Sequence, residues 1–208
     1  LNEYKGKITE YDVWNEPIHE MYTANTCGWN YIDSAFIWAH QADPEAKLYI
    51  NDYNVVSAGE TDRYVTLIKD MLSRKVPIHG IGVQCHFGTR PVVPALIKER
   101  LDKLAALGIP IKVTELDFGA WDKGLTISEE EQASEYEKAL TSFFSHPAVN
   151  GVVMWGFWDN RHWVQKGGII RADGSEKPAA KKIYDLWHKT WTTEQTVTAD
   201  ENGVAKFR

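Results

Sequence analysis

The sequence predicts an α/β protein whose parallel sheet is part of a (β/α)8 barrel. Three observations lead to this prediction. Short apolar segments alternate with amphipathic helical segments along most of the chain, and this alternation is typical of parallel strands joined by right-handed crossovers. The apolar segments are nearly continuous, as expected for strands buried on both faces. Polar side chains follow each apolar segment, and in barrels the carboxyl ends of the strands carry the active site.

Five segments are predicted to be strands. Each is short and apolar, and each ends at a group of polar or aromatic residues, which is the pattern of a buried strand followed by a loop. The predicted strands are residues 7–14, 47–50, 80–83, 109–114 and 151–155.

Five helices are predicted from apolar residues that recur at spacings of three and four. Ser128 is expected to cap one of them, with Glu131 three residues later completing a capping box. Gly108 is expected to end the preceding helix, and Pro147 the one that Ser128 begins. The predicted helices are residues 31–42, 60–73, 92–107, 128–146 and 178–190.

An open doubly wound sheet would also fit the alternation. No Gly-x-Gly-x-x-Gly turn follows a predicted strand, however, so a dinucleotide site is not expected, and the polar strand ends favour the barrel. Because five strands do not close a barrel of eight, we expect three strand–helix units to precede Leu1. Residues 1–190 are assigned to the C-terminal part of a catalytic domain. Residues 191–208 are assigned to a tail that forms a hairpin or begins an appended β-domain.

Composition bears on the class of function. The chain has 208 residues and a formal net charge of −6, and without a basic stripe no nucleic-acid partner is expected. It contains no apolar run of membrane-spanning length, so no membrane partner is expected. His-Glu-x-x-His is absent from the sequence, so neither a catalytic metal nor another cofactor is expected. Cys27 and Cys85 are interpreted as free or buried thiols.

Two glutamates follow predicted strands that are far apart in sequence. Glu16 follows the first strand and Glu115 the fourth, and because strand ends converge at the mouth of a barrel, the two carboxyl groups can meet there. Glycoside hydrolysis requires such a pair, one group to protonate the leaving oxygen and one to attack the anomeric carbon. Most acidic residues are simply exposed at the surface, but these two are placed at strand ends beside groups that can tune them.

The neighbours of the two glutamates fit this chemistry. Asn15 carries an amide that can bind a sugar 2-hydroxyl, a contact that strengthens in the transition state. His86 and Asp117 can form a carboxylate–imidazole–carboxylate chain with Glu115, and a cationic imidazole there favours the ionised nucleophile. His86 taken alone is equally well explained as a structural histidine.

Aromatic residues cluster after the last predicted strand. The segment 153–159 reads Val-Met-Trp-Gly-Phe-Trp-Asp, and Trp163 follows it. In a hydrophobic core these tryptophans would be ordinary bulk. At the active-site end of a barrel, Trp155 and Trp163 are better explained as walls that stack on sugar rings.

These motifs resemble those of family 10 glycoside hydrolases, the endo-β-1,4-xylanases. The Tyr-Asp-Val-Trp-Asn-Glu-Pro segment and the Thr-Glu-Leu-Asp segment resemble the ends of the family's strands 4 and 7. Three further segments are similar to the ends of its strands 5, 6 and 8. The five segments are residues 11–17, 51–54, 80–86, 111–117 and 153–163.

The resemblance implies that the chain holds strands 4 to 8 of the barrel and cleaves internal bonds of xylan with retention. It implies that Glu16 is the general acid/base and Glu115 the nucleophile, held ionised by His86 and Asp117. Asn15 would bind the sugar 2-hydroxyl. The remaining implied substrate-binding residues are Tyr53, Gln84, Trp155 and Trp163. Xylan or xylo-oligosaccharide is the implied substrate, and an extracellular or periplasmic location is expected because the polymer is too large to enter cells.

The sequence also departs from the family pattern. Trp14 and Cys85 stand where the family usually has smaller residues, and the lysine, histidine, tryptophan and asparagine of its first three strands are not in this chain. Two alternatives therefore stay open. One is another retaining (β/α)8 glycanase, such as a cellulase or mannanase. The other is a fragment that binds carbohydrate without catalysis.

Overall fold

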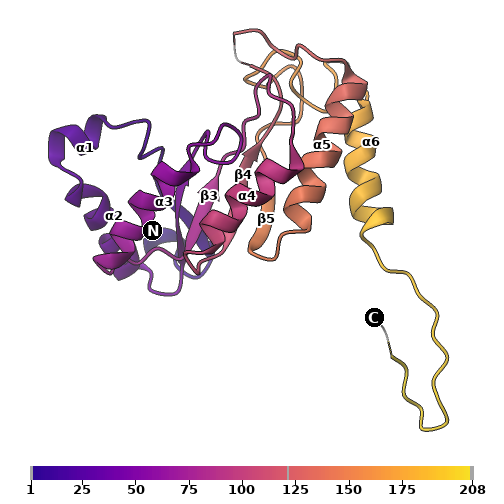
Figure 1. Cartoon of the computed structure of the whole chain (residues 1–208), viewed down its shortest axis with the longest axis horizontal. Coiled ribbons are helices and arrows are strands. Elements are labelled where there is room, and N and C mark those ends of the chain that lie inside the picture. The colour runs from indigo at the N-terminus through magenta and orange to yellow at the C-terminus, as the bar shows by residue number, and fades with distance from the viewer. Residues whose placement is uncertain (1, 121, 207–208) are drawn as a thin grey trace.

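The computed structural model describes residues 2–120 and 122–206. Within this part, one sheet of parallel strands has the spatial order β1-β2-β3-β4-β5, identical to the order along the chain (Figure 1). A doubly wound sheet would reverse its order at a switch point, so this order is that of a barrel segment, as predicted. The strands are β1 Glu10–Asn15, β2 Lys47–Asp52, β3 Gly80–Val83, β4 Ile111–Leu116 and β5 Val149–Met154.

Helices connect the strands, and consecutive helices contact one another from α3 through α6. Such contacts arise when the connections all cover the outer face of one curved sheet. The predicted helices are confirmed with small shifts of their ends, whereas the short helix α1 was not predicted. The helices are η1 Asn2–Tyr4, α1 Tyr22–Cys27, α2 Asn30–Ala42, α3 Thr61–Ser73, α4 Pro94–Ala105, α5 Glu129–Phe144, α6 Pro178–Asp185 and the π-helical turn η2 Leu186–Thr190.

Local sequence explains where several helices begin. Ser128 precedes α5, and its hydroxyl accepts from the backbone N–H of Glu131 over 3.1 Å, while the Glu131 carboxylate accepts from the backbone N–H of Ser128 over 2.9 Å. The predicted capping box is therefore confirmed. Pro94 and Pro178 stand at the first positions of α4 and α6, where a missing N–H costs nothing.

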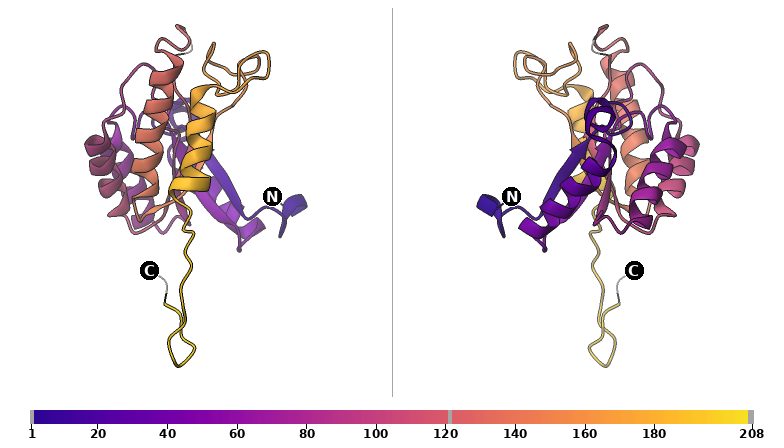
Figure 2. Two further views of the ribbon diagram at one scale, coloured as in Figure 1. Left: turned by 90° about the vertical axis from the view of Figure 1, so that its right-hand side faces the viewer. Right: turned by 90° about the vertical axis from the view of Figure 1, so that its left-hand side faces the viewer.

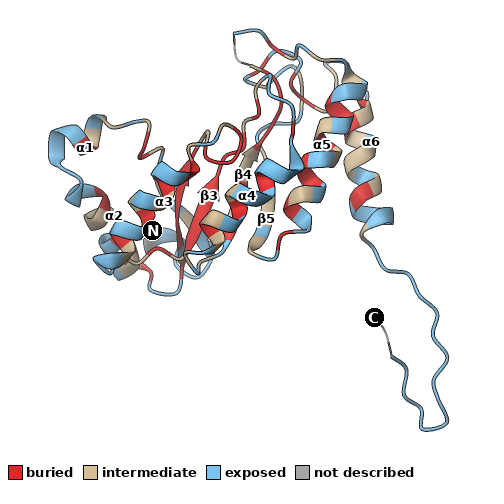
Figure 3. Cartoon of the chain, viewed as in Figure 1, coloured by how far each residue is buried: buried red, intermediate tan, exposed pale blue. Residues whose placement is uncertain are grey.

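The core lies between the sheet and the helix layer, where Figure 3 shows the helices turning their buried stripes inward. Phe36 of α2, Ile68 of α3, Leu101 of α4 and Phe143 of α5 are each 0% exposed. Burial of one such side chain stabilises the fold by about 1.5–3 kcal/mol, so this layer fixes the sheet that carries the strand ends.

Two glycines of β3 leave room on the inner face of the sheet. A Cβ on Gly80 would lie 2.1 Å from the ring of Tyr49, and a Cβ on Gly82 would lie 2.5 Å from Oδ1 of Asn51. The strand register pairs these same residues, Tyr49 with Gly80 and Asn51 with Gly82. The glycines therefore admit the two β2 side chains into the barrel interior.

The described sheet has two edges, β1 and β5, as expected for five strands of an eight-stranded barrel. The ring of Trp191 stacks on Phe144, and the tail beyond Trp191 extends away from the body in all views (Figures 1 and 2). It makes a turn in which the N–H of Asp200 donates to the carbonyl of Val204 over 3.0 Å, and its described part, to residue 206, contains no strand. Its assignment as the start of an appended domain stays a prediction.

Candidate active site

The carboxyl ends of the strands open into a cleft of about 630 Å³. Four predicted residues, Glu16, Tyr53, Gln84 and Trp155, stand at the first position after β1, β2, β3 and β5. The cleft is lined by seven of the nine predicted site residues, namely Glu16, Tyr53, Gln84, His86, Glu115, Trp155 and Trp163. Asn15, which is exposed, and Asp117, which is buried, bond to residues that line it. The structure thus brings all nine together.

Shortly after β1, β2 and β3 the backbone adopts a left-handed conformation. Glu16 has φ +61°, Asn54 has φ +58° and Cys85 has φ +62°, a conformation that costs a non-glycine residue about 1–3 kcal/mol and clusters at functional sites. The Glu16 turn is held by its N–H, which donates to the carbonyl of Asn51 over 2.7 Å. This backbone bond fixes where the Glu16 side chain leaves the strand.

Gln84 connects Glu16 to Asn15. Its amide Nε2 donates to Oε1 of Glu16 over 2.8 Å and approaches Oδ1 of Asn15 at 3.3 Å. Gln84 is buried and Glu16 is half-buried, so the bond is formed away from bulk water. Because a carboxyl oxygen accepts this bond in either protonation state, Gln84 can hold Glu16 in place as it gains and loses a proton.

Asn51 performs the corresponding role for Glu115, which lies within β4. Its amide Nδ2 donates to Oε1 of Glu115 over 2.9 Å and to Oδ1 of Asn15 over 2.8 Å. Its own Oδ1 accepts from the hydroxyl of Thr114 over 2.7 Å. The register that pairs Asn15 with Asn51 makes this contact possible. Through Gln84, Asn15 and Asn51, one hydrogen-bonded chain connects the two glutamates.

His86 lies between two carboxylates, as predicted. Its Nδ1 is 2.7 Å from Oδ1 of Asp117, and its Nε2 is 3.4 Å from Oε2 of Glu115. Burial acts to lower the pKa of His86, but the carboxylates of Asp117 and Glu115 outweigh it and raise the pKa to about 9. The imidazole is therefore cationic at neutral pH. Trp163 holds Asp117 from the other side, since its Nε1 donates to Oδ2 of Asp117 over 2.5 Å.

Sequence reasoning did not assign three residues of this site. Asn51 and Thr114 support Glu115, and His19 contacts the Tyr53 ring. Asn51 and Thr114 could have been found from position, because each stands near the carboxyl end of a strand next to a recognised site residue. His19 gives no comparable signal, since its place depends on how the loop after β1 folds back.

Asp12 and Tyr53 lie in the electrostatic field of the glutamates. Burial and then the charge of Glu115 raise the pKa of Asp12, and burial and then the charge of Glu16 raise the pKa of Tyr53. Burial is the larger cause of both shifts, and the negative charges of the two glutamates add to it.

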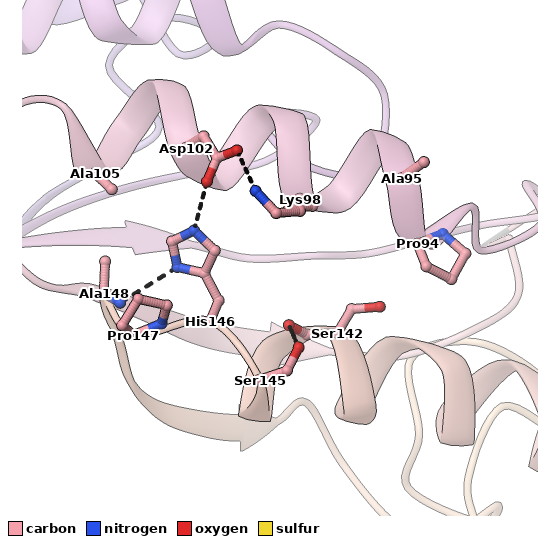
Figure 4. A pocket seen from close by; sticks show the side chains of 10 residues that line it. All are labelled: Pro94, Ala95, Lys98, Asp102, Ala105, Ser142, Ser145, His146, Pro147 and Ala148. Carbon is pink, nitrogen blue, oxygen red and sulfur yellow. Dashed lines mark hydrogen bonds and ion pairs between the residues drawn. The ribbon is translucent and has the colours of Figure 1, made fainter.

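A second hollow, of about 530 Å³, lies between α4 and α5 and is shown in Figure 4. Its His146 faces Asp102, with Nε2 3.2 Å from Oδ1, while its Nδ1 accepts from the backbone N–H of Ala148 over 3.3 Å. Ser145 points its hydroxyl to the carbonyl of Ser142. The imidazole therefore has no free nitrogen for a serine nucleophile, and catalysis is better assigned to the cleft.

Across residues 2–120 and 122–206, no group of three or more histidine, cysteine or acidic side chains is arranged to hold a metal ion. The helices found in those same residues all lack the length and apolar character required to cross a bilayer.

Comparison with known sequences gives a consistent result. A profile of glycosyl hydrolase family 10 matches residues 1–186. Endo-1,4-beta-xylanase 1 of Arabidopsis thaliana is 34% identical over 212 residues, covering 100% of this chain and 22% of the relative. The anti-sigma-I factor RsgI6 of Acetivibrio thermocellus is also 34% identical, over 208 residues, covering 100% of this chain and 26% of that protein.

Solved structures agree with the sequence matches. Xylanase 10B of Thermotoga maritima superimposes with a TM-score of 0.81 at 28% identity, covering 91% of this chain and 63% of that one. An enzyme of Thermoanaerobacterium saccharolyticum, described as an intracellular xylanase, gives a TM-score of 0.77 at 32% identity, covering 88% and 60%. The chain thus spans about a quarter of the length of the first two relatives and less than two thirds of these structures.

Proposed function

Because this chain belongs to glycosyl hydrolase family 10, we propose that it forms the part of a retaining endo-1,4-β-xylanase that carries both catalytic glutamates. The observation that supports this most strongly is the hydrogen-bonded chain that connects Glu16 to Glu115 at the base of one cleft. We further propose that three upstream strand–helix units complete the barrel and the glycone side of the cleft. We call that assembly the complete enzyme.

Glu115 is proposed as the nucleophile. An amide N–H of Asn51 and the cationic ring of His86 face its two oxygens, and both stabilise a negative charge. In the first step a Glu115 oxygen forms a bond to the anomeric carbon while the bond to the leaving oxygen breaks. The result is a covalent glycosyl–enzyme intermediate, in which the sugar is attached with inverted configuration.

Glu16 is proposed as the acid/base. In the first step it gives its proton to the leaving oxygen, so that the departing saccharide leaves as a neutral alcohol. In the second step the Glu16 carboxylate takes a proton from water, the water oxygen attacks the anomeric carbon and Glu115 is released. Two inversions give net retention. The Gln84 bond keeps the Glu16 side chain in place through both steps.

The aromatic residues are proposed to bind the xylan backbone. Trp155 and Trp163 line the cleft and are 49% and 46% exposed, so part of each ring is accessible to a ligand. Trp163 is also oriented by its bond to Asp117. A flat, half-exposed ring beside the nucleophile is suited to stack on the C–H face of a sugar.

The test is hydrolysis of xylan by the complete enzyme, with the anomeric configuration of fresh products followed by NMR. Retention predicts β-anomer first. Glu115→Gln should abolish turnover of every substrate. Glu16→Ala should lose activity on xylan but retain far more on an aryl xyloside with a good leaving group, because general acid help is typically worth about 10²–10⁴-fold. Equal losses on the activated substrate would contradict the roles proposed, and fresh α-anomer would contradict retention.

One alternative has a specific observation behind it. The match to an anti-sigma-I factor equals the match to a plant xylanase in identity, so the same fold also occurs in a protein named for regulation. If this chain serves regulation instead of catalysis, it would bind xylo-oligosaccharide without cleaving it. Titration calorimetry that detects binding, together with no sugar released over days, would favour this alternative over catalysis. Activity on cellulose or mannan but not xylan would instead favour another glycanase.

We propose that the enzyme acts outside the cytoplasm, because polymeric xylan is too large to enter cells. A relative described as intracellular supplies the competing case, in which short oligosaccharides are the substrate. Comparing kcat/KM for polymeric xylan with that for xylotriose separates the two. A strong preference for xylotriose would count against the extracellular proposal.

A further inference from the structure

A second imidazole lies at the mouth of the cleft and is not used in the chemistry described above. His19 stands three residues after Glu16, and its ring is placed between the end of β2 and the start of α3. Its Nδ1 is 2.5 Å from Oδ1 of Asp52, and its Nε2 is 3.1 Å from Oε1 of Glu60. Each nitrogen of the ring thus faces one carboxyl group, so the side chain bridges the two acidic residues.

Asp52 connects this ring to the backbone of two loops. Its side chain is 0% exposed and accepts from the backbone N–H groups of Ile18 and Tyr53, each over 2.8 Å. Burial raises the pKa of Asp52, while the bonds from Ile18 and His19 act against it. A buried carboxylate needs such partners. His19 and Asp52 therefore join the loop that follows Glu16 to the loop that begins at Tyr53.

His19 also supports the ring of Tyr53. The two rings are stacked, with centroids 3.6 Å apart and planes 19° apart. Tyr53 lines the cleft together with Glu16. The stacked contact is favourable, and it fixes the plane in which the Tyr53 ring meets a ligand.

The position of Tyr53 indicates which part of the substrate it meets. Tyr53 and Glu16 line the same part of the cleft at the ends of the neighbouring strands β2 and β1, and in the proposed mechanism Glu16 protonates the leaving oxygen. Trp163 lies instead beside His86 and Asp117, on the side of the nucleophile. The departing saccharide is therefore the part of the substrate adjacent to Tyr53.

We propose that His19 is a positioning residue for the leaving saccharide, acting through Tyr53. By bridging Asp52 and Glu60 beneath the Tyr53 ring, it holds that ring ready to stack on the sugar that departs. This inference rests on the proposed function. Its consequence is selectivity between leaving groups: a substrate whose leaving group is a sugar needs His19, and an activated aryl leaving group that needs neither stacking nor a proton does not.

Two variants of the complete enzyme distinguish the contribution of the His19 ring from that of its bonds to Asp52 and Glu60. His19→Phe keeps a flat ring under Tyr53 and removes both carboxylate contacts, whereas His19→Gln keeps a side-chain donor and removes the ring. Each should lower kcat/KM on xylotetraose about tenfold, the scale of one aromatic contact, mainly through KM. Each should change kcat/KM on a dinitrophenyl xylobioside less than twofold. His146→Phe is the matched control, because His146 also faces a carboxylate but lies between α4 and α5.

A double-mutant cycle with Tyr53→Ala shows whether His19 acts through Tyr53. If it does, adding His19→Phe to Tyr53→Ala costs nothing further on xylotetraose. Additive losses, or equal losses on both substrates, would overturn the proposal and leave His19 a purely structural residue. Titration of xylotetraose into the Glu115→Gln background gives the same comparison without turnover. A wild-type enzyme that neither cleaves nor binds xylotetraose would overturn the proposed function and with it this inference. An active wild type with a uniform His19 effect would overturn this inference alone.

Discussion

Asn51 and Glu115 are joined by a hydrogen bond of 2.9 Å between an amide N–H and a carboxylate oxygen. The bond spans two strands, β2 and β4, that are not adjacent, and it crosses the inner face of the sheet above Gly82. It places a neutral donor on one oxygen of the proposed nucleophile while His86 faces the other. Variants that disturb this arrangement, or the groups that support it, should therefore change activity or stability.

Asn51→Ala should lower kcat on xylan by about 10- to 100-fold, because a hydrogen bond to a charged group is worth about 1.5–3 kcal/mol. Steady-state kinetics on the complete enzyme measures the change. Asn150→Ala is the control, since Asn150 donates to the hydroxyl of Tyr49 over 3.1 Å without touching either glutamate. A loss below twofold for Asn51→Ala would show that His86 alone suffices.

Asp117→Asn should lower the pKa of the His86 ring. Asp117 is one of the groups that raise the pKa of His86 to about 9, and the amide cannot replace its charge, although its carbonyl can still accept from Trp163. NMR titration of the His86 imidazole measures the change, and an unchanged titration would mean that Glu115 alone keeps the ring protonated.

The same raised pKa gives a stability prediction. Protonation of His86 stabilises the folded state fully below its unfolded pKa of 6.5, and this contribution is lost as pH rises through about 9. The free energy of unfolding should therefore fall between these pH values, and Asp117→Asn should move the fall to lower pH. Urea unfolding at several pH values measures it.

Gly82→Ala should reduce activity about tenfold without removing any chemical group. Its new Cβ would meet Oδ1 of Asn51 at 2.5 Å, and displacing Asn51 removes support from Glu115. Gly151→Ala is the matched control, because its Cβ would meet only the flexible end of Lys112, at 3.1 Å. A crystal structure of the Gly82 variant with Asn51 unmoved would contradict the prediction.

Lys177→Met should destabilise the loop that carries Trp163. The ammonium group is buried and lies 2.9 Å from Oδ1 of Asp159 and 2.8 Å from the carbonyls of Lys166 and Gly168. Removing one partner of a buried pair costs about 3–5 kcal/mol, and removing both costs less. Thermal unfolding should therefore show partial recovery when Asp159→Asn is added. No recovery would mean that the carbonyl contacts, and not the ion pair, fix the loop.

The fold was largely predictable because the spacing of apolar residues along the sequence indicates which side of each helix or strand is buried. The helix at Ser128 was predicted with its cap, since the capping box is a local signal. Strand ends were less certain: Glu115 was expected after a strand and lies inside β4, because ladder hydrogen bonds continue beyond the apolar run. Helix α1 was missed since it is only one to two turns long and lacks apolar periodicity.

The site was predictable where motifs are contiguous and less so where contacts come from the register. Glu16 and Glu115 stand in recognisable segments. The role of Asn51 follows from its pairing with Asn15 across β1 and β2. This register cannot be read from a single sequence. His19 depends on a loop conformation that buries Asp52, and no spacing rule along the chain predicts that fold-back.

The open edges of the sheet have a practical consequence for handling this chain. β1 and β5 each present one row of backbone amides and carbonyls without a neighbouring strand in the described part of the molecule, and β5 contributes Val149, Val152 and Val153 to that edge. Unprotected edges of this kind template pairing with other chains. Prepared by itself, the polypeptide should therefore self-associate and precipitate, and co-expression with a segment that supplies the flanking strands should keep it dispersed.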